Sequence, residues 1–198
     1  IMVVNVGTLF DGEALTFQGL NTDKKVVNKI LHNCNKYFEA RRGLAENFDL
    51  WKQPIPYAVI TRGDEVFTYE RLKGGGEKRL HNKLSIGVGG HMNRVNDIRD
   101  FQSNLDFNIF RELAEEVSIR DTLPLEHEVI GLINDDSTEV NRVHLGILVE
   151  IKLSEESQVD VREKDVLDGY WIRKQDLIKD PLFDRLEDWS QIVAKWMV

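Results

Sequence analysis

Strands and helices are mixed along the chain, as its pattern of hydrophobic and polar positions indicates. Short apolar or alternating runs, which are typical of strands, occur at residues 2–6, 15–17, 57–60, 66–69, 84–88, 129–133, 144–151 and 169–172. Apolar residues at helical spacing predict helices at residues 26–38, 104–117, 175–178 and 186–196. Because the two kinds of element do not alternate strictly, the pattern favours an α/β layered sandwich with a mixed sheet.

Three stretches suggest how these elements begin and end. The run Pro54–Pro56 forces an extended backbone, so we expect an N-terminal extension at residues 1–53 and the main domain at residues 54–198. The polar stretch Arg62–Glu65 has the composition of a β-hairpin turn. Ser103 followed by Asp106 resembles a capping box and predicts a helix start near Asn104.

The segment Arg111–Ile119 concentrates acidic residues on one face of the predicted helix. At about 100 degrees per residue, Glu112, Glu115 and Glu116 fall within one arc, while the apolar residues point the other way. This arc is either a solvated surface or a site for a divalent cation. The pair Glu112 and Glu116 is repulsive, and the helix C-terminus disfavours negative charge. A bound cation would offset both penalties.

Composition narrows the classes of function. The chain has 198 residues, 41% of them hydrophobic, and a formal net charge of −8. This charge argues against a nucleic-acid polymer or an anionic membrane as partner. A single cysteine, Cys34, cannot form an intrachain disulfide, and no long apolar run or signal pattern is present. We therefore expect a cytoplasmic protein.

The acidic helix resembles the signature of Nudix (MutT-like) hydrolases, G-x5-E-x7-R-E-U-x-E-E-x-G-U, where U is a bulky apolar residue. The run Arg111–Glu116 matches R-E-U-x-E-E at every position, and Ile119 matches the last U. Two positions depart: Ser118 replaces the last glycine and Ser103 the early glutamate. The loop between Gly90 and Arg111 is also longer than the family's pattern. The resemblance covers about residues 56–180, and the chain is similar to a MutT-type subgroup of predicted phosphoesterases.

The resemblance implies a Nudix-like α/β/α sandwich and a metal-dependent activity. Glu115 and Glu116 would be the main ligands of Mg²⁺ or Mn²⁺, with Glu112 and the backbone carbonyl of Gly90 completing the set. Arg111 would orient Glu115. The expected reaction is hydrolysis of a phosphoanhydride bond in a nucleoside diphosphate linked to another moiety.

The general base and the substrate contacts are less specific in the sequence. Glu163 and Glu139 lie in loops and are both candidates for the base, with Glu163 preferred; each is equally well explained as a surface carboxylate. His91 and Lys83, together with Glu139, are candidate substrate contacts. The resemblance implies a small diphosphate-containing substrate, with a nucleotide as the expected kind, and a homodimer is left open.

Two other functions are compatible with the same residues. The fold could serve as a catalytically inactive domain that senses a ligand or binds a protein, which the substitutions at Ser103 and Ser118 motivate. An isomerase on the same scaffold is the third alternative. Turnover that depends on a metal discriminates the hydrolase from both.

Overall fold

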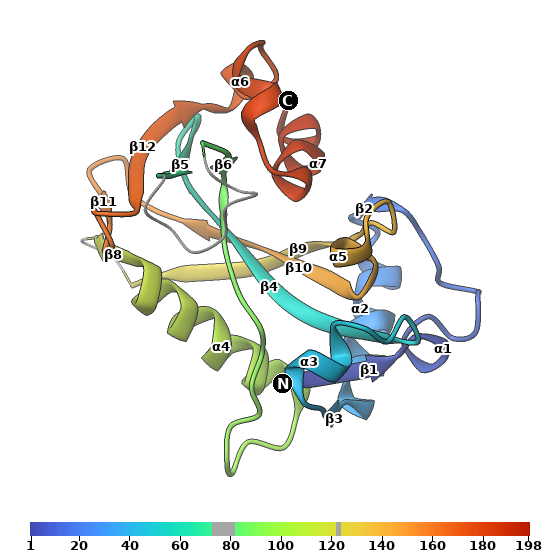
Figure 1. Cartoon of the computed structure of the whole chain (residues 1–198). Helices are drawn as coiled ribbons and strands as arrows, with labels where there is room; N and C mark the ends of the chain where they lie inside the picture. Colours follow the sequence, from blue (N-terminus) through green and yellow to red (C-terminus); the bar gives the residue numbers. More distant parts are fainter. Residues whose placement is uncertain (73–81, 122–123) are drawn as a thin grey trace. The chain divides into compact units, whose positions relative to one another are not determined.

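The computed structural model describes residues 1–72, 82–121 and 124–198. Its α-helices (Figure 1) are α1 Val6–Leu9, α2 Lys24–Asn33, α3 Arg42–Ala45, α4 Phe101–Glu116, α5 Glu139–Arg142, α6 Leu182–Arg185 and α7 Asp188–Met197. Two 3₁₀ segments of the described residues, written η, are η1 Cys34–Lys36 and η3 Lys174–Asp176. Its strands are β1 Met2–Asn5, β2 Gly19–Asn21, β3 Phe38–Glu39, β4 Trp51–Arg62, β5 Glu65–Arg71, β6 Leu84–Ser85, β7 Gly87–Val88, β8 Val117–Arg120, β9 Glu126–Asn134, β10 His144–Lys152, β11 Gln158–Val161 and β12 Leu167–Arg173.

The expected α/β class with a large mixed sheet is confirmed. Hydrogen bonds order the strands as β12-β5-β4-β10-β9-β2, and β8 and β11 form a separate pair. None of the helices described is both long and apolar enough to cross a membrane. The chain divides into two compact units. The first unit comprises residues 1–57, 89–111 and 129–148, and the second comprises residues 58–88, 112–128 and 149–198.

The first unit contains the N-terminal strand and helix. Strand β1 pairs antiparallel with β3 and with β4, placing Val4 opposite Lys52. Helix α2 begins after Asp23, whose carboxylate accepts the backbone N–H groups of Lys25 and Val26. The helix is shorter than expected because the chain tightens into η1 at Cys34 and then extends into β3.

The strand expected at residues 15–17 is wrong. Asp11 and Gly12 both have positive φ, and the chain turns back so that the N–H of Leu15 donates to the carbonyl of Phe10 at 3.0 Å. Local turn bonds therefore use the backbone groups that a strand would need. The strand that does form is β2, which pairs antiparallel with β9.

The second unit is built on antiparallel pairs of β4, β5 and β12. The predicted hairpin is confirmed: Thr61 pairs with Val66, and Gly63 has a φ of 49° in the turn. Strand β12 continues the pairing from Leu167 to Arg173 along the whole of β5. Helix α7 packs Trp189 and Val193 into the core of this unit.

The proline-rich segment Pro54–Pro56 lies inside β4 and is buried, so its extended backbone is confirmed. The boundary expected at residue 54 does not coincide with the end of an element. The division into an extension at residues 1–53 and a domain at residues 54–198 stays a prediction.

Candidate active site

Helix α4 begins earlier than the sequence indicated. Asp100, rather than Ser103, caps it: the carboxylate of Asp100 accepts the N–H of Ser103 at 2.8 Å. The expected capping box at Ser103 and Asp106 is therefore wrong. Asp106 instead accepts a side-chain hydrogen bond from Gln102 on the same helix. The Asp100 side chain satisfies one of the N–H groups that every helix leaves open at its start.

Two buried asparagines on α4 hold the long connection that precedes this helix, at residues 92–100. Asn104 accepts the N–H of Val95 at 2.9 Å, and Asn108 exchanges two hydrogen bonds with the backbone of Asn93 at 2.9 and 3.0 Å. Both side chains have no exposed surface. Their spacing of four residues on the apolar side of the helix is the signal in the sequence for this polar row.

Arg111 continues this polar row. Its Nη2 donates to the carbonyl oxygen of His91 at 2.9 Å and to Oδ1 of Asn108 at 3.2 Å. The structure thus brings together two predicted site residues, Arg111 and His91, through a backbone contact that the sequence did not indicate. The role of Arg111 in orienting Glu115 stays a prediction.

The three glutamates of the signature differ in environment. Glu112 is buried with 8% of its surface exposed, whereas Glu115 is exposed. Glu116 is partly buried, and its Oε2 atom is buried without a hydrogen-bond partner. The pKa of Glu116 is raised to about 7, mainly by burial; Arg71 lowers this pKa, and the nearby carboxylates of Glu112 and Glu187 raise it.

Glu116 is surrounded by residues that the sequence analysis missed. Arg71, at the end of β5, donates from Nε to Oε1 of Glu187 at 3.0 Å. Tyr69, on the same strand, is buried and donates its hydroxyl to the carbonyl of Gly87 at 2.9 Å. Arg71 and the Tyr69 hydroxyl both lower the pKa of Glu116. These groups are far apart in sequence, so only the pairing of β5 with its neighbours could reveal them.

The donor chemistry of this cluster fits a hard divalent cation. A carboxylate oxygen that is buried without a partner is costly, and an oxygen-ligated metal would satisfy Oε2 of Glu116. Within the described parts of the chain, no three His, Cys, Asp or Glu side chains are gathered closely enough to hold a metal ion. Mg²⁺ is commonly bound through one or two carboxylates, with water and phosphate oxygens as its other ligands. The residues present fit that mode of binding.

Gly89, which precedes the long connection, lies close to the backbone of β4. A Cβ atom on Gly89 would overlap the carbonyl oxygen of Pro56, so only glycine fits there. Gly90 and His91 follow directly in the first unit. The backbone carbonyl of Gly90 as a metal ligand stays a prediction.

His91 faces a second histidine. Its Nε2 lies 3.4 Å from Nε2 of His144, the first residue of β10. Burial lowers the pKa of His91 to about 4, with contributions from the charges of Arg42 and His144. Burial also lowers the pKa of His144. Both rings are therefore neutral at pH 7, and His91 is not a standing positive charge for a phosphate.

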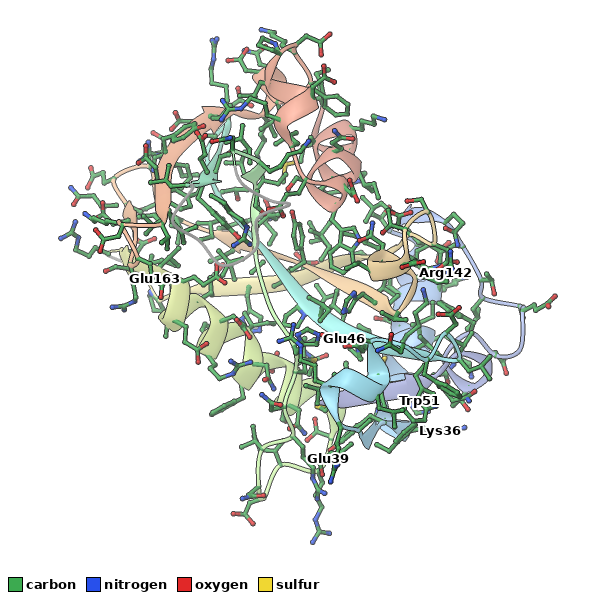
Figure 2. All side chains as sticks on the ribbon, in the orientation of Figure 1. Lys36, Glu39, Glu46, Trp51, Arg142 and Glu163 are labelled. Atoms are coloured by element: carbon green, nitrogen blue, oxygen red, sulfur yellow. The ribbon has the colours of Figure 1, made fainter. Side chains whose placement is uncertain are left out.

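The remaining candidates lie as follows. Glu163 is exposed in the loop after β11 (Figure 2), and the N–H of the preceding Arg162 donates to the carbonyl of Glu116 at 2.9 Å. Glu139 is exposed in the first turn of α5. The ammonium of Lys83 donates to the carbonyl of Asp184 at 3.0 Å. The loop of Glu163 is thus tied to the end of α4 within the second unit.

Ser118, at the position of the family's last glycine, lies in β8. It pairs with Asp160 of β11 in an ordinary extended conformation. Because this position does not require a positive φ, serine causes no backbone strain here.

Comparison with known proteins agrees with the fold and the signature. No family model matches the chain. The chain is 46% identical over 195 residues to Protein YmaB of Bacillus subtilis (strain 168), covering 98% of this chain and 95% of that protein. The solved structure of Tm1382, described as a candidate Nudix hydrolase, superposes with a TM-score of 0.78 at 32% identity, covering 100% of this chain and 97% of that one.

These likenesses extend over nearly the whole chain. The fold and the acidic helix define a hydrolase of mixed α/β architecture. The chain belongs to the Nudix hydrolase family.

Proposed function

We propose that this Nudix hydrolase uses Mg²⁺ or Mn²⁺ to cleave a phosphoanhydride bond in a nucleoside diphosphate linked to another moiety. The observation that carries the proposal is Glu116: it occupies the last glutamate position of R-E-U-x-E-E, and its Oε2 atom is buried without a hydrogen-bond partner. An isolated buried carboxylate oxygen is costly unless a ligand completes it.

Glu115 and Glu116 would hold the cation, with Glu112 and the carbonyl of Gly90 as further donors. When bound, such a cation neutralises the diphosphate and lowers the pKa of a coordinated water. Glu115 is exposed. Glu112 is buried.

The residues around Glu116 would favour the ionised carboxylate, which is the form that binds a divalent cation. Arg71 supplies a positive charge that lowers the pKa of this carboxylate, and its hydrogen bond to Glu187 holds it in place. The Tyr69 hydroxyl lowers the pKa of Glu116 from the same strand. Together they oppose the burial that favours the protonated form, so that Glu116 can give up its proton near neutral pH when a cation arrives.

Glu163 is the preferred general base. Its loop is anchored to the C-terminal end of α4 by the hydrogen bond from Arg162 to Glu116, and its side chain is solvent-exposed and able to take a proton from water. Glu139 is the second candidate, and as an exposed residue of a short helix it has no comparable support.

The test is a panel of nucleoside diphosphate derivatives incubated with the purified chain and Mg²⁺ or Mn²⁺. We expect release of a nucleotide or of phosphate that stops when the metal is chelated. Glu116→Gln should lower turnover by at least about 100-fold while the protein stays folded, and Glu163→Gln should lower kcat with a smaller effect on KM. Glu126→Gln, an exposed glutamate of the second unit, is the matched control.

The inactive alternative has its own support. Ser103 stands at the position of the early glutamate, and the carboxylates of the described residues are not gathered around one point. A chain that bound a nucleotide tightly but released no product with any metal would favour a ligand-sensing or protein-binding role.

A further inference from the structure

The first unit contains a pair of imidazoles that the proposed hydrolysis does not use. The Nε2 atoms of His91 and His144 lie 3.4 Å apart, with the ring planes inclined at 65°. His91 follows Gly89 and Gly90, and His144 is the first residue of β10, two residues after the end of α5. Glu46, labelled in Figure 2, is the residue after the end of α3 and interacts electrostatically with both rings.

The two hydrogen-bond contacts of His144 indicate that its Nε2 atom turns a lone pair toward His91. Nδ1 of His144 lies 2.6 Å from the carbonyl oxygen of Val140. A carbonyl oxygen only accepts hydrogen bonds, so Nδ1 carries the proton of the neutral ring, and Nε2 is left with a lone pair. Nε2 of His91 then donates its proton to that lone pair. If His91 shifts its proton to Nδ1, both Nε2 atoms become donors to a cation.

The distance between these two nitrogen atoms is compatible with their binding one metal ion. Zinc binds imidazole nitrogen at about 2.0–2.1 Å in tetrahedral geometry, which separates two such nitrogens by about 3.4 Å. The hydrogen bond from Nδ1 of His144 to a backbone carbonyl is also the usual support of a metal-binding histidine. The backbone of His91 is fixed by Arg111, which donates to its carbonyl at 2.9 Å.

We propose that His91 and His144 form a two-histidine site for a borderline or soft divalent cation, namely Zn²⁺, Ni²⁺ or Cu²⁺. Imidazole favours these ions, whereas the carboxylates of α4 favour Mg²⁺ and Mn²⁺. The chain thus carries two donor sets of different chemical preference, and the histidine site takes none of the α4 glutamates.

The charges nearby suit such a cation. The carboxylate of Glu46 supplies a negative charge and is held by Nε of Arg42 at 2.7 Å. No third His, Cys, Asp or Glu of the described residues joins the pair closely enough to act as a ligand. Water therefore completes the coordination, and the site is open and exchangeable rather than structural.

The test measures Zn²⁺ binding by calorimetry to the untagged full chain, with excess Mg²⁺ present to occupy the carboxylates. We expect one Zn²⁺ per chain, and binding that is at least about tenfold weaker in His91→Gln and in His144→Gln. His32→Gln, a change at an exposed histidine of α2, should bind as the unchanged chain does. Equal binding in all four proteins, or no binding in any of them, overturns the proposal.

A second measurement needs no variant and remains decisive if a substitution prevents folding. The imidazole ¹⁵N resonances of the unchanged chain should shift at Nε2 of both His91 and His144 when Zn²⁺ is added. Shifts confined to other histidines, or none, overturn the proposal. Neither measurement depends on hydrolysis. A negative result here therefore overturns the histidine site alone, and an absence of hydrolysis would overturn the proposed function alone.

Discussion

Arg71 donates from Nε to Oε1 of Glu187 at 3.0 Å, which joins the end of β5 to the residue preceding α7. This ion pair holds a cation beside Glu116, whose buried carboxylate lacks a partner at Oε2. A single guanidinium thus serves two carboxylates from different parts of the second unit.

Replacing Arg71 should raise the pKa of Glu116. In Arg71→Met the carboxylate loses the cation that lowers its pKa, so we expect a value above about 7 in the metal-free protein. The free energy of unfolding should fall by about 1 kcal/mol, because the lost ion pair is partly exposed. Carboxyl ¹³C titration and urea unfolding measure the two effects. In the control Arg62→Met, an ion pair with Glu65 is lost and the pKa of Glu116 should not move.

Glu116→Gln should remove most of the stabilisation by Mg²⁺. A cation that binds only the folded state raises its stability, so we expect Mg²⁺ to raise the Tm of the unchanged chain more than that of the variant. Thermal melting with and without Mg²⁺ measures this difference. An equal rise in both proteins would show that Glu116 is not a ligand.

The same variant has a pH signature without metal. The folded state holds the proton of Glu116 up to about pH 7, against 4.5 for the ordinary carboxyl. The contribution of this group to stability is therefore present below pH 4.5 and lost as the pH rises through about 7. As the pH rises over this window, the unchanged chain should lose unfolding free energy that Glu116→Gln keeps. The difference should reach about 1–3 kcal/mol at pH 8.

Gly89→Ala should distort the backbone that carries Gly90 and His91. The added methyl group would overlap the carbonyl oxygen of Pro56, so this segment or β4 has to move. We expect a loss of about 2–3 kcal/mol in the free energy of unfolding. Gly43→Ala, where a methyl group meets no neighbour, is the control. Similar losses in the two variants would contradict the close approach.

Gln53→Met should stabilise the protein. Gln53 has no exposed surface, and neither its Oε1 nor its Nε2 has a hydrogen-bond partner. Methionine has a similar shape without the polar atoms, so we expect a gain of about 1 kcal/mol, measured by urea unfolding. A loss would indicate that buried water bridges the amide.

His91 should make the metal-free protein sensitive to acid. Its pKa is about 4 in the folded state and 6.5 ordinarily, so the unfolded state binds the proton first. The stability due to the neutral ring is therefore complete above pH 6.5 and is lost as the pH falls toward 4. Across this window the unchanged chain should lose about 2 kcal/mol more than His91→Gln, as followed by denaturant unfolding at several pH values.

The acidic helix and the elements around it were predictable because their signals are local. Helix periodicity placed Glu112, Glu115 and Glu116 together, and the turn at Arg62–Glu65 was visible in its composition. The two wrong predictions also rested on local patterns. At residues 15–17 the backbone N–H of Leu15 bonds to the carbonyl of Phe10 in a turn, and at the start of α4 the N–H of Ser103 bonds to the carboxylate of Asp100.

What the sequence alone determined is the family signature and the carboxylates that a cation would use. What only the tertiary structure decided is their electrostatic setting: Arg71 and Glu187 beside Glu116, and His91 against His144. The reason is physical. Helical spacing follows from backbone geometry over a few residues, whereas burial and charge pairing depend on strands that meet from distant parts of the chain.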